Sequence, residues 1–249
     1  MNLRIYCIFP LRIQKIIPGL CTKLVTKTDR SARRAMTTSF EISSILNPVQ
    51  AQDTSRQEDV EVLPLVEKLC DALETQRIAY CHWKSNDVIE RSANGQNDLD
   101  LLISRADATR FTEILAQLEF KQAKAPLEKQ MPAVLDYYGY DQEVDKFIHV
   151  HAHYQLIMGH DMTKNFRLPI ETPYIESSVR KNLFRVPEAE FEFIVFVVRV
   201  VLKHSTWDTI LGHEGKLKTS ERRELSYLRN RIDQAHVHEI LKCHFPFIY

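Results

Sequence analysis

Two aspartates separated by one residue, Asp98 and Asp100, are the residues of this chain whose spacing most directly predicts chemistry. They lie in the run Gly95-Gln-Asn-Asp-Leu-Asp-Leu-Leu-Ile103, which predicts a β-strand. Alternation along a strand places both carboxylates on one face, and Leu99 and Leu101 on the other. A divalent cation with oxygen ligands relieves the repulsion between neighbouring carboxylates. The pair therefore predicts a metal site, and the alternative is a solvated edge strand whose charges block aggregation.

A lysine and a small hydroxyl residue, Lys84 and Ser85, follow an apolar, β-favouring segment at residues 78–82. A lysine and loop amides at a strand end can bind a triphosphate, while carboxylates on the next strand bind the metal that bridges it. A solvated charge is the alternative for Lys84, and the neighbouring acidic strand favours the phosphate role. Lys164 lies in an expected loop, where it is equally suited to contact a nucleotide phosphate or to remain solvated.

Three histidines, His149, His151 and His153, alternate along a predicted strand and therefore share one face. Imidazole suits zinc, manganese or iron better than magnesium, and it also serves as a general base near neutral pH. The three positions span roughly 13 Å, which is too far for one ion. A site that joins two of them to Asp98 or Asp100 is therefore favoured. The alternative is a polar sheet face that lines a cleft without a metal.

Hydrophobic periodicity predicts the elements that position these residues. In chain order they are a helix over 60–76, strands over 78–82 and 98–103, a helix over 104–118, a strand over 120–123, and a hairpin of strands 134–140 and 147–156. After a polar loop, Pro187 precedes an apolar helix over 188–203, and helices over 220–231 and 233–243 follow. We therefore expect an α+β fold, with a mixed sheet, flanking helices and a C-terminal helical region. Arg199, inside the apolar helix, is expected to pair with an acid.

The Lys84-Ser85 segment and the Asp98–Ile103 segment together resemble the nucleotidyltransferase superfamily of DNA-polymerase-β type. The pattern of that superfamily is a small-residue turn followed, after a short gap, by Asp-x-Asp on a strand. More closely, residues 78–218 resemble an uncharacterised bacterial branch, some members of which are joined to a thymidylate-kinase-like domain. The matching stretches are Tyr80-Cys-His-Trp-Lys-Ser-Asn86, Asp98–Ile103, His149–Leu156, Thr163–Glu171 and Leu202–Asp208. The resemblance implies a nucleotidyltransferase-like sheet, a nucleoside triphosphate substrate and a Mg²⁺ or Mn²⁺ ion held by Asp98 and Asp100, which are catalytic.

The sequence departs from the family pattern at two places. Lys84 precedes Ser85 where the family has Gly-Gly or Gly-Ser, and His151 stands at the position that matches the third carboxylate. The resemblance then implies that Lys84 and Ser85 contact the nucleotide, with Lys164 as a further candidate contact, and that His151 is catalytic as a third ligand or a base. The sequence contains no Gly-x-x-x-x-Gly-Lys-Ser/Thr run, so a kinase-like domain is expected only as a partner.

Composition narrows the class of protein. The net charge is zero, with 33 basic and 33 acidic residues, but residues 1–36 hold eight basic residues and one acid. The remainder is acidic, which argues against a nucleic-acid partner. Five cysteines without Cys-x-x-Cys spacing predict reduced thiols and a cytoplasmic protein. The apolar run at 193–202 is far shorter than the roughly 20 residues of a membrane helix, so no membrane partner is expected.

The basic N-terminal segment resembles an organelle-targeting peptide, and the alternative is that Met36 is the true start. We expect residues 1–55 to form a disordered or targeting-like extension, 56–158 the nucleotidyltransferase-like domain and 159–249 the helical region.

The predicted function is a metal-dependent transfer of a nucleoside monophosphate from a nucleoside triphosphate to a hydroxyl acceptor, which is a small molecule or a protein. A non-catalytic nucleotide-binding module of the same fold is the alternative, because the third carboxylate is missing. A metal-dependent hydrolase that uses histidine and aspartate ligands is the third candidate.

Overall fold

Five strands form the central sheet of the protein. The computed structural model describes residues 62–126, 130–131, 133–160, 163–204 and 217–246, all within the unit 59–247 of the chain. The strands are β1 (Tyr80–His82), β2 (Leu99–Ile103), β3 (Lys121–Ala123), β4 (Val134–Asp141) and β5 (Lys146–His153). Their order is β1-β2-β5-β4-β3, in which β2 and β5 are parallel and the other neighbours are antiparallel. The predicted strands and the predicted hairpin are confirmed.

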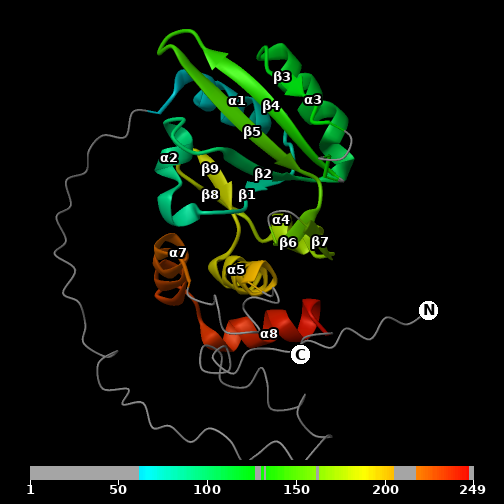
Figure 1. Ribbon diagram of the computed structural model, residues 1–249, viewed down its shortest axis with the longest axis vertical. Helices are drawn as coiled ribbons and strands as arrows, with labels where there is room; N and C mark the ends of the chain where they lie inside the picture. The colour runs from blue at the N-terminus through cyan, green and yellow to red at the C-terminus, as the bar shows by residue number, and fades with distance from the viewer. Residues whose placement is uncertain (1–61, 127–129, 132, 161–162, 205–216, 247–249) are drawn as a thin grey trace, which may run out of the picture. The chain divides into compact units, whose positions relative to one another are not determined.

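Helices α1 (Pro64–Thr75) and α3 (Ala108–Gln117) cover one face of this sheet (Figure 1). The core residues that β2 and β5 direct toward these helices include Leu99, Leu101, Val150 and Ala152. Each buried leucine or valine side chain contributes about 1.5–3 kcal/mol to folding. Because side chains alternate along a strand, burial of this set turns Asp100 toward the opposite face of the sheet.

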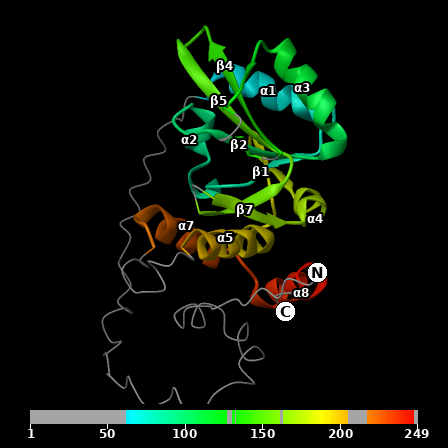
Figure 2. The ribbon, with the colours of Figure 1, turned by 45° about the vertical axis from the view of Figure 1, so that its right-hand side comes forward.

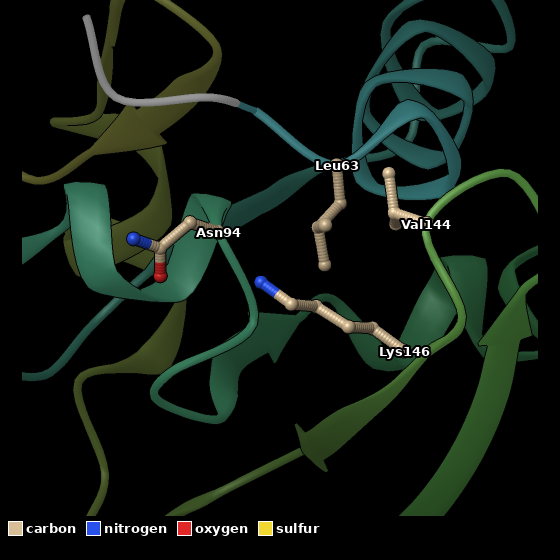
Figure 3. Close-up of a pocket in the computed structure, with 4 residues that line it drawn as sticks. All are labelled: Leu63, Asn94, Val144 and Lys146. Atoms are coloured by element: carbon tan, nitrogen blue, oxygen red, sulfur yellow. The ribbon is translucent and has the colours of Figure 1, made fainter.

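The segment between β1 and β2 contains η2 (Asn86–Val88) and α2 (Glu90–Ala93), and it ends in a tight turn. Gly95 in this turn has a φ of +72°, and a Cβ added there would lie 2.7 Å from Leu63 Cδ1. Leu63, Asn94, Val144 and Lys146 line a cavity of about 400 Å³ beside the turn (Figure 3). The turn therefore favours glycine for its backbone conformation, and a Cβ at this position would in addition require Leu63 to move.

We expect Gly95→Ala to lower the free energy of unfolding by about 2 kcal/mol, because a left-handed residue with a Cβ is strained by about 1–2 kcal/mol. The contact with Leu63 adds to this strain. Chemical denaturation measures the change. In a Leu63→Ala background the contact is relieved, and a loss of about 1 kcal/mol should remain. An unchanged unfolding midpoint for Gly95→Ala would contradict the prediction.

Three helices complete the described chain: α5 (Ala189–His204), α7 (Thr219–Arg229) and α8 (Gln234–His244). Figures 1 and 2 both show α5 between the strands and α8. The first half of α5 is buried, and Phe191, Phe193 and Phe196 are at most 5% exposed. The mixed sheet, its flanking helices and these C-terminal helices confirm the predicted fold class. No helix within the described ranges is both long enough and apolar enough to cross a bilayer.

The segment predicted as a polar loop, residues 157–186, instead contains short strands and a helix. These elements are β6 (Leu156–His160), β7 (Thr163–Leu168), α4 (Glu171–Glu176), β8 (Val179–Lys181) and β9 (Phe184–Val186), with β6 paired to β7 and β8 to β9. Hairpins this short are marginal in isolation, so sequence patterning does not reveal them. Tertiary packing supports them here, because Met158 of β6 and Phe184 of β9 are buried.

The helix predicted over 104–118 forms as η3 (Arg105–Asp107) followed by α3. The extension expected over 1–55 lies outside the described residues. The domain division expected between residues 158 and 159 stays a prediction, and β6 spans that point.

Candidate active site

Three adjacent strands place polar residues in a row on the sheet face opposite α1 and α3. Asp100 of β2 is in register with His151 of β5, and His151 is in register with Asp136 of β4. Residues directly paired across neighbouring strands point to the same face of a sheet. The row therefore consists of a carboxylate, an imidazole and a second carboxylate.

Asp100 is the centre of a cluster of four polar side chains. Its Oδ1 lies 2.5 Å from Lys84 Nζ, 3.0 Å from His151 Nδ1 and 3.6 Å from His153 Nε2. The two imidazoles also face each other, with 3.2 Å between His153 Nε2 and His151 Nδ1. The structure thus brings two of the three histidines to one aspartate, as their spacing predicts.

The protonation states of this cluster follow from burial and from its charges. Burial by itself would raise the pKa of Asp100, but the Lys84 ammonium and hydrogen bonds from His151 and His153 hold that pKa well below its usual range. Burial lowers the pKa of His153 to about 3. Near neutral pH the cluster therefore contains an ionised carboxylate and an uncharged imidazole. The His153 ring is fixed by edge-on packing against Trp83, with 4.9 Å between ring centres.

A second, more exposed group lies next to the Asp100 cluster. His149 is held between two carboxylates, with its Nδ1 2.9 Å from Asp98 Oδ1 and its Nε2 2.9 Å from Asp136 Oδ1. The ring also stacks on Tyr138 with 4.5 Å between ring centres. A neutral imidazole donates a hydrogen bond to only one of the two carboxylates, whereas the protonated ring donates to both. Asp100 of β2 and Asp98, which directly precedes the strand, therefore have different partners.

The turn after β1 directs Lys84 toward the acidic strand. Ser85 has a φ of +55°, a left-handed conformation that glycine adopts most readily. The small residue that the family pattern has in this turn is consistent with that backbone. The amide of Ser85 donates to Glu224 Oε1 at 3.4 Å, and the amide of Trp83 donates to the carbonyl of Asp100 at 3.1 Å. The turn is thus tied both to β2 and to α7.

A cleft of about 290 Å³ is lined by this turn, by β6 and by helices α5 and α7. Two members of the Asp100 cluster, Lys84 and His153, line it. The other cations that line it are Arg199, Lys203 and Arg223. The cleft is therefore a space next to the Asp100 cluster in which anionic groups of a ligand can meet cations of the protein.

Each of these three cations has a carboxylate partner. The pairs are Arg199 with Glu224 at 2.7 Å, Lys203 with Glu221 at 3.4 Å and Arg223 with Asp87 at 2.6 Å. The expected pairing of Arg199 with an acid is confirmed. The charges of the cleft are balanced, so an anionic ligand must compete with these carboxylates for the cations.

Lys164 lies in strand β7, so the loop predicted for it is wrong. Its side chain lies outside the described part of the structure, and its phosphate role stays a prediction. On the same strand, Arg167 bonds to Glu171 at the start of α4, with 3.1 Å between Nε and Oε1. Arg167 thus has a partner in the protein.

Asp136 is the residue of the site that sequence reasoning missed. It lies in the first strand of the predicted hairpin, where an isolated aspartate carries no motif. Its position follows from the register, because pairing of Asp141 with Lys146 across the turn places residue 136 opposite His151. The turn length fixes this register, and a shift by one residue would turn Asp136 to the other face.

The resemblance implies a divalent metal, and the donors present here fit one in a particular way. Asp100, His151 and His153 offer ligand atoms that all lie within 4.8 Å of one another. Among the described residues, Asp98 belongs to no such group of three. Magnesium prefers oxygen ligands, whereas imidazole suits manganese, zinc and iron. The site can therefore hold a divalent metal, with more nitrogen ligands than an all-carboxylate magnesium site has.

No protein-family model matches the chain, and no curated protein matches it. A solved structure with some similarity is the solution structure of antibiotic-resistance factor ANT(2'')-Ia. The match has a TM-score of 0.42 and 11% sequence identity, and it covers 74% of this chain and 91% of that chain. At this level the similarity does not bear on function, which must be inferred from the site.

Proposed function

We propose that the protein is a metal-dependent nucleotidyltransferase, which moves a nucleoside monophosphate from a nucleoside triphosphate to a hydroxyl acceptor. The observation that carries this proposal is the Asp100 cluster at the edge of the cleft, which Lys84 and His153 both line. A carboxylate grouped with further metal-ligating side chains, next to a cleft with several cations, is what phosphoryl transfer requires. The resemblance of the Lys84-Ser85 and Asp98–Ile103 segments to nucleotidyltransferases supports the same function.

In this proposal the triphosphate lies in the cleft. Its phosphates meet Lys84, the backbone at Ser85 and the cations of α5 and α7, which exchange their carboxylate partners for phosphate oxygens. Lys164 is included as a phosphate contact from the sequence pattern alone. A metal held by Asp100 would balance the charge of this carboxylate, and Lys84 would then be available to the phosphates.

The proposed reaction is an in-line displacement at the α-phosphorus. The acceptor oxygen forms a bond to this phosphorus, the bond to the bridging oxygen breaks, and pyrophosphate leaves. A divalent metal, Mg²⁺ or Mn²⁺, held by Asp100 with Asp98 on the same face, would stabilise charge on the phosphoryl oxygens. His151, whose Nδ1 faces Asp100, is assigned as the third ligand or as the base that takes the proton of the acceptor hydroxyl.

The acceptor is proposed to be a small molecule or a protein hydroxyl. A nucleic-acid acceptor needs an excess of basic side chains around the site, since phosphate contacts supply most of such binding. Here the net charge of the chain is zero, and Arg199, Lys203 and Arg223 in the cleft have acidic partners.

Two measurements on the purified full-length chain test this function. Calorimetric titration with each nucleoside triphosphate and Mn²⁺ measures binding. Release of pyrophosphate, together with transfer of an α-phosphate label into a small-molecule extract or a protein extract, measures the reaction. We expect binding and a stoichiometric appearance of labelled product and pyrophosphate. Absence of nucleotide binding would exclude the proposal.

A non-catalytic nucleotide-binding module is the second candidate. The specific observation in its favour is the ion pair between Lys84 and Asp100, which balances the charge of the carboxylate without a metal. Nucleotide binding without pyrophosphate release, in the presence of both extracts, would favour this module over the enzyme.

A further inference from the structure

Three ligand atoms of the Asp100 cluster are spaced as the ligands of one transition-metal ion. Asp100 Oδ1, His151 Nδ1 and His153 Nε2 are separated by 3.0, 3.2 and 3.6 Å. A tetrahedral ion with bonds of about 2.0–2.1 Å to nitrogen and oxygen has ligands about 3.3–3.4 Å apart. The three measured separations lie on both sides of this value. Little movement is therefore needed for the three atoms to bind one ion.

Neighbouring side chains hold these ligands in place. His153 is 3% exposed, and its Nε2 points to Asp100 and His151 while its ring packs against Trp83. Within the described residues its other nitrogen, Nδ1, is buried and has no hydrogen-bond partner. The described polar contacts of the His153 ring are therefore made by Nε2, which faces the Asp100 cluster.

A cation already lies beside the carboxylate. Lys84 Nζ is 2.5 Å from Asp100 Oδ1, and the two side chains are each 17% exposed. An ammonium group at this distance balances the same negative charge that a metal would balance. Lys84 and a metal on Asp100 would therefore compete, since two cations so close together repel each other.

We propose that Asp100, His151 and His153 bind one divalent transition-metal ion, of the zinc, cobalt or manganese class, in preference to magnesium, and that Lys84 competes with this ion. The preference follows from the donors, because two of the three are imidazole nitrogens. Three protein ligands leave a coordination position open, as in catalytic rather than structural metal sites. The role of this metal in the reaction rests on the proposed function, whereas the binding of the metal does not.

The experiment is a titration of the full-length protein with Co²⁺, followed by its visible absorption and by calorimetry, without nucleotide. We expect binding at one site with the absorption of nitrogen ligation, and a large excess of Mg²⁺ should not displace the ion. His151→Gln and His153→Gln should each weaken binding by about 100-fold or more, beyond the effect of a lost outer contact. His149→Gln is the matched control, because this histidine lies on the same strand outside the group of three, and it should leave Co²⁺ affinity unchanged.

Lys84→Met provides a second variant whose expected effect is a gain. Removal of the competing ammonium should strengthen Co²⁺ binding by roughly tenfold or more. A misfolded variant cannot mimic this result, and circular dichroism checks the fold of the histidine variants. Absence of Co²⁺ binding, equal competition by Mg²⁺, or an equal loss in His149→Gln would each overturn the proposal.

The outcomes also separate this proposal from the proposed function. Nucleotide transfer with Mg²⁺ in a protein that does not bind Co²⁺ would refute the metal site and leave the transferase standing. Tight Co²⁺ binding without nucleotide binding would refute the transferase and leave the metal site standing.

Discussion

Replacement of Asp100 by asparagine should reduce pyrophosphate release by about 10²–10³-fold, the loss typical when a group that stabilises transition-state charge is removed. The Asp100 carboxylate contacts Lys84, His151 and His153, so each of these three groups interacts with its negative charge. Asparagine keeps the shape of the side chain but supplies a neutral oxygen, which is a weak ligand for a divalent ion. The measurement is the rate of pyrophosphate release at saturating nucleotide. Unchanged turnover in Asp100→Asn would refute the assignment.

The same substitution should also destabilise the fold, which calls for a control. Asp100→Asn removes the carboxylate that balances the Lys84 ammonium, and loss of one partner from a largely buried pair costs roughly 3 kcal/mol. The double variant Lys84→Met/Asp100→Asn removes both charges and should recover most of this stability without recovering activity. Recovery of activity along with stability would mean that Asp100 acts only through the fold.

A buried carboxyl in α5 should make stability fall as the pH rises. Glu192 is 3% exposed, and its Oε1 has no hydrogen-bond partner within the described residues. Burial raises the pKa of Glu192 to about 7, with a further rise from Glu224 and opposing effects from Asn86, Arg231 and Arg199. Between the ordinary value of 4.5 and about 7, the folded protein keeps a proton that the unfolded chain has lost. Stability from this group is therefore complete below pH 4.5 and is lost as the pH rises to about 7.

The expected size of this effect is about 3 kcal/mol, from about 1.4 kcal/mol for each pH unit of the window. Glu192→Gln keeps the polar shape but cannot ionise, so it should be more stable than wild type by about 3 kcal/mol near pH 8, and equal to it within about 1 kcal/mol near pH 4.5. Guanidinium unfolding at these two pH values measures the difference. A difference between variant and wild type that does not change with pH would show that Glu192 is ionised, or already exposed, in the folded protein.

Alternation and periodicity predict β2, the β4–β5 hairpin and α5, but not β6, which also lines the cleft. Strand β5 has a clear period of two, β2 is a short run of mostly apolar residues, and α5 is apolar over most of its length, so local patterning identifies them. The shared face of Asp98 and Asp100 also follows from this period. The strand order does not, because the parallel pairing of β2 with β5 is set by packing of their apolar faces under α1 and α3 rather than by neighbouring sequence.

The sequence does not predict which side chains contact each other between different strands and turns. The sequence pattern predicts a phosphate contact for Lys84, whereas its ammonium contacts Asp100, because the turn with Ser85 in a left-handed conformation directs it there. Asp136 reaches His149 only through the register of the hairpin. Such contacts depend on turn length and on backbone angles at single residues, which composition and spacing do not determine.

The parallel pairing of β2 with β5 also determines when the Asp100 cluster can form. Asp100 and His151 are 51 positions apart, and the β4–β5 hairpin that carries His151 is a local structure. During synthesis β2 leaves the ribosome well before the hairpin, and closure of so long a loop is slower than formation of the hairpin itself. We therefore expect the cluster to form when the hairpin docks onto the edge of β2. A chain interrupted before residue 149 has the acidic strand but none of the three histidines of β5.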